Sequence, residues 1–206
     1  MEKIIFLDRD GTINEEVNYL HRTEDLKFLP GVPEALRLLK EAGFKLVVVT
    51  NQAGVARGYY TCADVEHLHA YMNEELKKYG AEIDAFYYCP HHPVQGIGIY
   101  KKVCQCRKPG TGMLLQAEER FRIDKAHSYM IGDKLLDVEA GVNYGVPGIL
   151  VGTGYGADIN REIKEKGEKP LYDFYAETLM DAARYIRARE GKTASAVLIS
   201  RPYGDK

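Results

Sequence analysis

The chain has 206 residues, and its 28 lysines and arginines against 30 aspartates and glutamates give a formal net charge of −2. This length predicts one domain that can bury a full hydrophobic core without disulfide bonds. A content of 45% hydrophobic and 28% charged residues excludes a wholly disordered or collagen-like chain. The lack of a cationic excess argues against a protein that binds duplex DNA through its phosphates.

The predicted elements alternate along the chain between short apolar strands and amphipathic helices. We expect strands at residues 4–7, 44–49, 83–88, 128–131 and 148–151, and helices at 33–42, 61–79, 112–121, 135–143, 159–166 and 177–190. The strand runs are continuously apolar, which is typical of a parallel sheet covered on both faces. The alternation therefore predicts an α/β fold with a Rossmann-like, doubly wound parallel sheet.

The same pattern predicts a single domain over residues 1–190 and a C-terminal tail over 191–206, where the composition changes. No large insertion follows Gly11 or Asn51, so we expect no separate cap domain. The N-terminal apolar run is too short for a signal peptide, and no run approaches the ~18 residues of a membrane span. We expect a cytoplasmic protein with no membrane partner, in which cysteines stay reduced.

Polar side chains follow the predicted strands where each strand ends. Asp8 and Asp10 follow the first strand, Thr50 and Asn51 the second, and Asp133 the fourth. Ligands of doubly wound sheets bind beyond these carboxyl ends. Two carboxylates so close together repel unless a cation or proton lies between them, and a few carboxylates with water suit Mg²⁺. The alternative is that Asp8 and Asp10 only form a turn.

The chain contains, in this order, Asp8-Arg9-Asp10-Gly11-Thr12, Thr50-Asn51, Lys108-Pro109 and Gly132-Asp133-Lys134. These motifs resemble the four motifs of the haloacid dehalogenase superfamily phosphatases, and the match covers residues 3 to about 151. The resemblance implies phosphoryl transfer through an aspartyl phosphate on a Rossmann-like core.

The residue types fit that chemistry. Asp8 can act as the nucleophile, and Asp10 can protonate the leaving oxygen and later deprotonate water. Thr50 and Asn51 can donate hydrogen bonds to the phosphoryl oxygens, and Lys108 adds a fixed positive charge. We expect Asp8, the Asp10 carbonyl and Asp133 to bind Mg²⁺. Asp137, which follows in the chain, would either orient a lysine or be an exposed helix acid.

Two local pairs of cysteine and histidine predict a second metal site: Cys89 with His91, and Cys104 with Cys106. Three sulfur ligands and one nitrogen ligand suit a closed, structural Zn²⁺ site. The segment between the pairs has little core-forming content and would gain order from the metal. The alternatives are incidental thiols with a surface histidine, or His92 as the ligand in place of His91. Cys62 is expected to be a bystander.

The cysteine motifs also resemble two zinc-loop groups of the superfamily, the D-glycero-D-manno-heptose-1,7-bisphosphate 7-phosphatases and the histidinol-phosphate phosphatases. The long span from His91 to Cys104 and the segment 51–58 are more similar to the first group. That resemblance implies removal of a C7 phosphate in nucleotide-heptose and lipopolysaccharide biosynthesis. Histidinol phosphate, another small monoester, or a zinc-stabilised phosphosugar-binding protein without catalysis stay as alternatives.

On this resemblance, the substrate contacts are Glu16, Val17, Asn18, Tyr19, Asn51, Gln52, Ala53, Arg107 and Lys134. The planar guanidinium of Arg107 suits a second phosphate, and the alternative is a surface arginine beside the zinc site. Arg57, Lys101 and Lys102 are more typical of solvated charges. We expect a monomer whose partner is a small sugar bisphosphate and not a nucleic acid.

Overall fold

The computed structural model describes residues 1–199, with side chains described as far as 191. Six strands form one sheet in the order β3-β2-β1-β4-β5-β6. They are β1 (Lys3–Leu7), β2 (Phe44–Asn51), β3 (Ala85–Cys89), β4 (Tyr129–Gly132), β5 (Gly148–Val151) and β6 (Phe174–Ala176). All neighbouring strands pair in parallel. Strands β2 and β3 are added on one side of β1, and β4, β5 and β6 on the other. Doubly wound sheets bind ligands at this switch point between β1 and β4.

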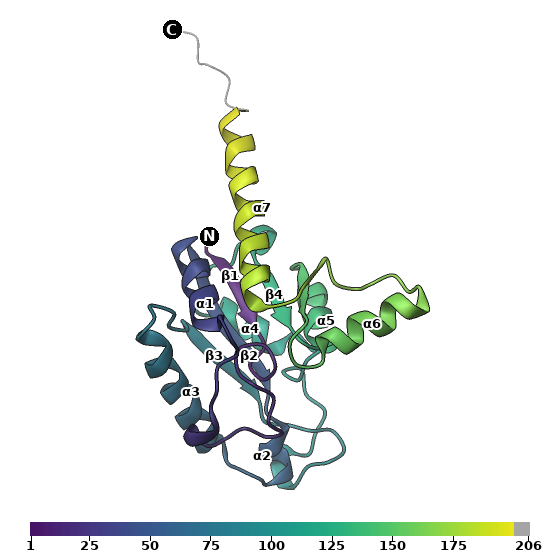
Figure 1. The fold of residues 1–206 in the computed structure, drawn as a ribbon. Coiled ribbons are helices and arrows are strands. Elements are labelled where there is room, and N and C mark those ends of the chain that lie inside the picture. The colour runs from purple at the N-terminus through teal and green to yellow at the C-terminus, as the bar shows by residue number, and fades with distance from the viewer. Residues whose placement is uncertain (200–206) are drawn as a thin grey trace.

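Helices cover both faces of this sheet (Figure 1). They are α1 (Val32–Glu41), α2 (Ala53–Arg57), α3 (Cys62–Lys77), α4 (Gly112–Glu118), α5 (Leu135–Tyr144), α6 (Gly156–Lys166) and α7 (Leu179–Ile199). Within the described part of the chain, no helix is long and apolar enough to cross a membrane.

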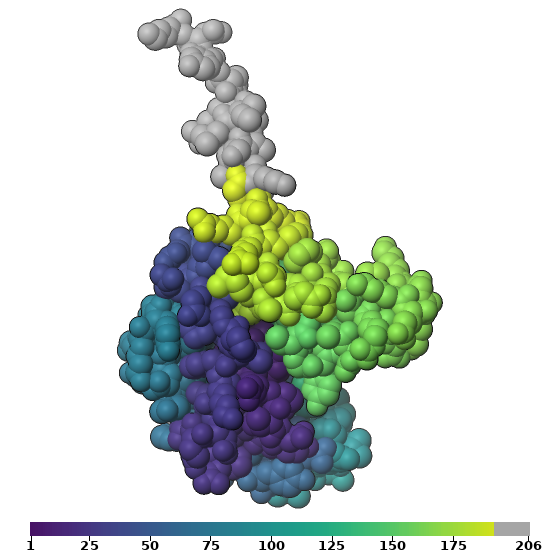
Figure 2. All heavy atoms as spheres, in the orientation of Figure 1, coloured from purple at the N-terminus to yellow at the C-terminus, as the bar shows by residue number. Residues whose placement is uncertain are grey.

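The alternation of side chains along β1 divides the core into two layers. Ile5 and Leu7 pack with residues of α1, α3 and α7. Ile4 and Phe6 pack with residues of α4 and α5 on the opposite face. Figure 2 shows α1 and the first part of α7 side by side on the first face. Because both faces are buried, the strand shows no polar alternation, as predicted for a parallel sheet.

The predicted strands are all present, with ends that differ by at most two residues. The sequence did not predict β6, which is three residues long, or α2, whose five residues include a glycine. Helix α7 begins at Leu179 and continues to Ile199, so it crosses the expected boundary between domain and tail. Residues 200–206 of that tail lie outside the described residues, and the division into domain and tail stays a prediction.

The connections that could have held a cap domain carry little regular structure. Between β1 and α1 the only regular element is a three-residue turn of 3₁₀ helix, Thr23–Asp25. After β2 comes the five-residue α2. The described chain is therefore one parallel sheet with its helices, as expected.

Candidate active site

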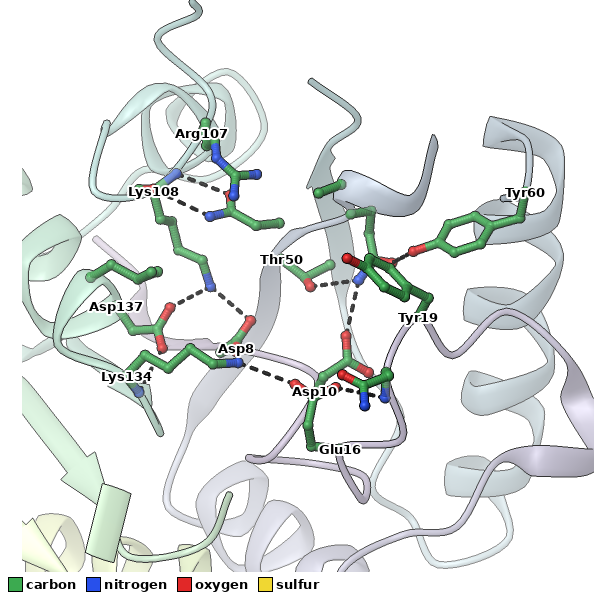
Figure 3. A pocket seen from close by; sticks show the side chains of 15 residues that line it. Asp8, Asp10, Glu16, Tyr19, Thr50, Tyr60, Arg107, Lys108, Lys134 and Asp137 are labelled. Carbon is green, nitrogen blue, oxygen red and sulfur yellow. Dashed lines mark hydrogen bonds and ion pairs between the residues drawn. The ribbon is translucent and has the colours of Figure 1, made fainter. Parts of the chain in front are cut away.

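A pocket of about 250 Å³ lies at the carboxyl ends of β1 and β2, beside the start of α5 (Figure 3). Most of the residues that the sequence predicts for the site line it: Asp8, Asp10, Glu16, Asn18, Tyr19, Thr50, Asn51, Gln52, Ala53, Arg107, Lys108 and Lys134. Val17 does not line it and is 41% exposed. Asp133 is fully buried and is absent from the lining. Tyr60, Leu136 and Asp137 complete the wall.

Lys108 joins two carboxylates in this pocket. Its Nζ atom lies 2.7 Å from Asp8 Oδ1 and 2.7 Å from Asp137 Oδ1. Burial opposes the charge of Lys108, but Asp137 and Asp8 outweigh it and raise the pKa of the ammonium group. Asp137 is fully buried, so the alternative of an exposed helix acid is wrong. Asp137 is a residue that orients Lys108.

The Asn51 side chain holds the backbone of Lys108. Its Oδ1 atom accepts a hydrogen bond from Lys108 N at 3.0 Å, and its Nδ2 atom donates to Lys108 O at 3.2 Å. The end of β2 thereby fixes the segment that carries Lys108. Both the oxygen and the nitrogen of the Asn51 side chain are therefore hydrogen bonded within the protein.

Asp8, Asp133 and Asp137 form a buried carboxylate cluster, with one oxygen of each within 4.8 Å of the others. Asp133 Oδ1 has no hydrogen-bond partner, and Lys134 Nζ is 3.7 Å from it. Burial and the neighbouring Asp8 raise the pKa of Asp133 to about 7. A divalent cation beside Asp8 and Asp133 would satisfy this oxygen and its charge, so the donor set fits Mg²⁺.

The loop after β5 holds Asp133 in a narrow cradle. Tyr155 N donates to Asp133 Oδ2 at 3.1 Å. A Cβ atom on Gly11 or on Gly154 would lie 2.4 or 2.2 Å from the same oxygen, and both glycines have positive φ angles of 81° and 56°. Sequence reasoning missed this loop. Its signal was the glycine-rich segment 152–156 directly after a predicted strand.

Asp10 has different surroundings from Asp8. Its carboxylate accepts hydrogen bonds from Arg9 at 2.9 Å, Asn14 at 3.0 Å and Gln52 at 3.1 Å. Burial opposes its charge, but Arg9 and these hydrogen bonds outweigh burial and lower the pKa of Asp10. The two aspartates of the first motif are therefore paired with two separate cations, Lys108 and Arg9.

The segment 16–19 forms one side of the pocket. Glu16 Oε2 pairs with Lys134 Nζ at 3.2 Å. Asn18 and Tyr19 both adopt left-handed backbone angles, with φ of 48° and 66°, which is uncommon for residues other than glycine. Arg57 lies 5.6 Å from the Tyr19 ring centre and also contacts Gln95 of the cysteine-rich loop, which spans residues 89–106.

The predicted zinc ligands come together in space. The three sulfur atoms of Cys89, Cys104 and Cys106 lie 3.3–3.5 Å apart. His91 Nδ1 is 3.3 Å from Cys106 Sγ. Burial raises the pKa of the Cys89 thiol, a cost that a bound cation would remove. Three sulfurs and one nitrogen, with spacing near the ~3.8 Å of tetrahedral zinc–thiolate geometry, fit Zn²⁺.

Cys62, and His92 as the alternative ligand, lie outside this cluster. His92 Nδ1 accepts hydrogen bonds from the backbone of Val94 at 3.2 Å and of Gln95 at 2.8 Å. Cys62 Sγ lies 3.6 Å from the hydroxyl of Tyr100. Neither belongs to the group of possible metal ligands found in the described residues.

The cysteine cluster adjoins the pocket through Arg107, whose Nη1 atom donates to His91 O at 3.2 Å. Arg107 lines the pocket, and Lys108 follows it directly. A well-ordered cysteine cluster would therefore help to fix the positions of Arg107 and Lys108 in the pocket.

Two family models match the chain. One, described as "HAD-hyrolase-like", matches residues 105–182, and one described as "Polynucleotide kinase 3 phosphatase" matches residues 3–139. The second covers more than half of the chain. Both descriptions agree with the phosphatase motifs at the ends of the strands.

Curated relatives are similar over most of the chain. The D-glycero-beta-D-manno-heptose-1,7-bisphosphate 7-phosphatase of Haemophilus influenzae is 42% identical over 91% of this chain and 98% of its own length. The protein of the same name from Escherichia coli (strain K12) is 50% identical over 73% of this chain and 79% of its own.

Solved structures show the same likeness. The D,D-heptose 1,7-bisphosphate phosphatase of B. bronchiseptica, complexed with magnesium and phosphate, has a TM-score of 0.77 and 32% identity, and the match covers 91% of this chain and 99% of that one. The corresponding enzyme of Burkholderia thailandensis has a TM-score of 0.62 and 29% identity, with 89% and 97% of the two chains covered.

Proposed function

Because this chain belongs to the D-glycero-beta-D-manno-heptose-1,7-bisphosphate 7-phosphatase family of haloacid dehalogenase-like hydrolases, we propose that it removes the C7 phosphate of that bisphosphate and leaves the C1 phosphate in place. The observation that carries the proposal is the pairing of the buried Asp8 carboxylate with Lys108 in the pocket that also holds Asp10. The names of the relatives favour the β anomer as substrate.

In the first half-reaction, an Asp8 oxygen attacks the phosphorus atom and forms the aspartyl phosphate. The bond from phosphorus to the sugar oxygen breaks, and Asp10, in its acid form, gives its proton to that oxygen. Thr50 and Lys108 offer a hydroxyl and a fixed positive charge to the phosphoryl oxygens. With the pocket empty, Arg9 favours the carboxylate form of Asp10, so the charge of the bound phosphate must help Asp10 to keep its proton.

In the second half-reaction, Asp10 takes a proton from water, and the resulting hydroxide attacks the phosphorus atom. The bond from Asp8 to phosphorus breaks, inorganic phosphate leaves, and Asp8 is again a carboxylate. Asp10 ends the cycle protonated, so the two steps together consume one water and no other reactant.

Asp8, Asp133 and the backbone carbonyl of Asp10 would hold Mg²⁺. When bound, the cation neutralises the charge of the phosphoryl oxygens and of the nucleophile. The unpartnered Asp133 oxygen and the magnesium in the related structure support this assignment. Lys134, 3.7 Å from Asp133 and 3.2 Å from Glu16, would turn toward the substrate when the cation is present.

The cysteine cluster would hold a structural Zn²⁺ through Cys89, His91, Cys104 and Cys106. All four protein ligands are supplied, which leaves no open position for water. Arg107 would bind the C1 phosphate, because a planar guanidinium can bind two oxygens at once. We further propose a monomeric enzyme that works in the cytoplasm in heptose biosynthesis.

The substitution Asp8→Asn tests the mechanism. It keeps the shape of the side chain but removes the nucleophile, so we expect kcat with Mg²⁺ to fall by about 10³-fold or more. Asp25→Asn, at an exposed position, is the matched control and should retain wild-type activity. Undiminished phosphate release by a folded Asp8→Asn variant would exclude the aspartyl-phosphate route.

The ratio of kcat/KM for two substrates tests the assignment of specificity. We expect wild-type enzyme to prefer the heptose bisphosphate over histidinol phosphate by about 10²-fold or more, because only the former has a second phosphate for Arg107. Comparable or reversed values would overturn this assignment and leave the phosphatase mechanism intact.

A further inference from the structure

The side chain of Gln52 is almost fully enclosed, with 2% of the residue exposed. Its Nε2 atom donates to Asp10 Oδ2 at 3.1 Å and to Thr50 Oγ1 at 2.9 Å. Its Oε1 atom accepts from Tyr60 Oη at 2.7 Å and from Arg9 Nη2 at 3.3 Å. An amide offers two N–H donors and two lone pairs, so the protein itself uses the whole capacity of this group.

Arg9 lies behind this amide and is fully buried. Besides Gln52, its guanidinium donates to the Asp10 carboxylate and to Leu20 O, the latter at 3.1 Å. Its Nη1 atom lies 3.3 Å from His69 Nε2. Burial lowers the pKa of His69 to about 3, so the ring is neutral and can accept that hydrogen bond.

These partners permit only one orientation of the Gln52 amide. Arg9 has donors and no acceptor, so it must face the amide oxygen. Burial raises the pKa of Tyr60 to about 12, so its hydroxyl keeps the proton that it donates to the same oxygen. If the amide rotated by half a turn, its NH₂ group would face Arg9 and its oxygen would face the Asp10 carboxylate, which is repulsive.

We propose that the side-chain amide of Gln52 is a positioning group, and that Tyr60 acts through it, beside the direct bond from Arg9, to aim Asp10 at the leaving oxygen. The inference deepens the proposed function and rests on it. Its specific consequence concerns the proton that Asp10 gives to the leaving oxygen. If Asp10 loses its position, proton transfer to the leaving oxygen is weakened more than substrate binding is.

The leaving group separates this role from a structural one. A sugar alkoxide must receive a proton as it leaves, whereas p-nitrophenolate leaves without one. The constant kcat/KM covers the steps up to the phosphorylation of Asp8 and omits the later hydrolysis of the aspartyl phosphate. A defect in the aim of Asp10 therefore lowers kcat/KM for the sugar ester and spares kcat/KM for p-nitrophenyl phosphate.

The first variant is Tyr60→Phe, which removes one hydroxyl and keeps the ring. We expect kcat/KM for the heptose bisphosphate to fall about tenfold, mainly through kcat, and the value for p-nitrophenyl phosphate to change less than about twofold. The matched control is Tyr79→Phe, because Tyr79 is exposed and follows the opposite end of α3. Equal losses for both substrates in Tyr60→Phe would overturn the proposal.

The second variant is Gln52→Met, which has a similar shape and cannot donate to Asp10 or Thr50. If Tyr60 acts through Gln52, then adding Tyr60→Phe to Gln52→Met should lower kcat/KM by less than about twofold further. Additive losses in the double variant would show that Tyr60 acts by another route and would contradict the proposal.

A readout without catalysis separates failure of this inference from failure of the proposed function. In wild-type protein both side-chain amide protons of Gln52 are hydrogen bonded, so NMR should find slow exchange with solvent, and Tyr60→Phe should make it at least about tenfold faster. Fast exchange in the wild type would overturn the inference whatever the substrate. If the wild type releases no phosphate from the heptose bisphosphate, the proposed function fails, and the exchange rates still decide the role of Gln52.

Discussion

Asp8 and Asp10 are two residues apart in the chain, yet each has its own cationic partner. Asp8 pairs with Lys108, which lies in the connection between β3 and α4. Asp10 pairs with its neighbour Arg9. Separate partners would let the two nearby carboxylates take the different roles proposed for them, one as nucleophile and one as acid and base. The motif itself predicted both aspartates. It did not predict that Arg9, a long charged residue, would be completely buried, because burial depends on the acceptors that distant segments supply.

His69 is such a distant partner, and it makes stability depend on pH. Its pKa in the folded protein is about 3, because of burial and Arg9, against about 6.5 when unfolded. A lowered histidine pKa stabilises the fold fully above pH ~6.5, and this contribution is lost as the pH falls from there towards 3. Between pH 6.5 and 5 we expect a loss of about 2 kcal/mol in the free energy of unfolding.

Urea denaturation at pH 7.5 and pH 5 measures this loss. His69→Gln keeps an acceptor for Arg9 but cannot be protonated, so its free energy of unfolding should fall by about 2 kcal/mol less than that of the wild type. Removal of the exposed His67 from the same helix, as His67→Gln, is the matched control. Equal losses in wild type and His69→Gln would contradict the assignment.

At the scale of elements, the site depends on the loops that follow the strands. The continuous apolar runs predicted the five longer strands, and their ends predicted the positions of Asp8, Thr50 and Asp133. The loop after β5 escaped prediction because Gly154 carries no chemistry of its own. It acts by having no Cβ atom beside Asp133, which only the folded structure reveals.

The substitution Gly154→Ala should weaken Mg²⁺ binding. The added Cβ atom would lie 2.2 Å from Asp133 Oδ2 and must displace that carboxylate. We expect the Mg²⁺ concentration for half-maximal activity to rise about tenfold or more, with a matching loss of affinity in calorimetry.

Gly167→Ala is the matched control for this prediction. Gly167 has a similar φ of 64°, and nothing lies within 4 Å of its added Cβ atom. Both variants should therefore lose about 1 kcal/mol of stability from backbone strain. Unchanged Mg²⁺ dependence in Gly154→Ala would show that the cradle does not position a metal ligand.

The cysteine-rich loop gives the second prediction at this scale. Metal analysis of protein purified without chelator should find about one zinc per chain. Cys104→Ser should lower the Tm by about 5–10 °C and raise KM, since Arg107 and Lys108 follow the cluster directly. Cys62→Ser, outside the cluster, is the control. A zinc-free wild-type protein would exclude the assignment.

At the scale of the whole molecule, the fold brings strand ends from distant parts of the sequence to one pocket. The sheet order places β1 between β2 and β4, so three of the four phosphatase motifs meet beside its carboxyl end. The alternation of strands and helices was enough to predict this architecture. It could not predict that Gln52 faces inward to Asp10, because a strand pattern does not determine how one amide is oriented.

The connections that follow β1 and β2 carry only the 3₁₀ turn Thr23–Asp25 and the five-residue α2 before α1 and α3 begin. On the proposed function, the substrate would be recognised by the phosphates at its two ends, one over Asp8 and one near Arg107. Such an arrangement would favour cleavage of one specific ester of a bisphosphate.

On the proposed function, this protein removes the C7 phosphate and no other. The most direct measurement follows D-glycero-β-D-manno-heptose 1,7-bisphosphate by ³¹P NMR with wild-type enzyme and Mg²⁺. We predict one equivalent of inorganic phosphate, loss of the C7 ester signal and an intact C1 phosphate, with no change in the presence of Asp8→Asn. Loss of the C1 phosphate, or no release that depends on Mg²⁺, would contradict the claim.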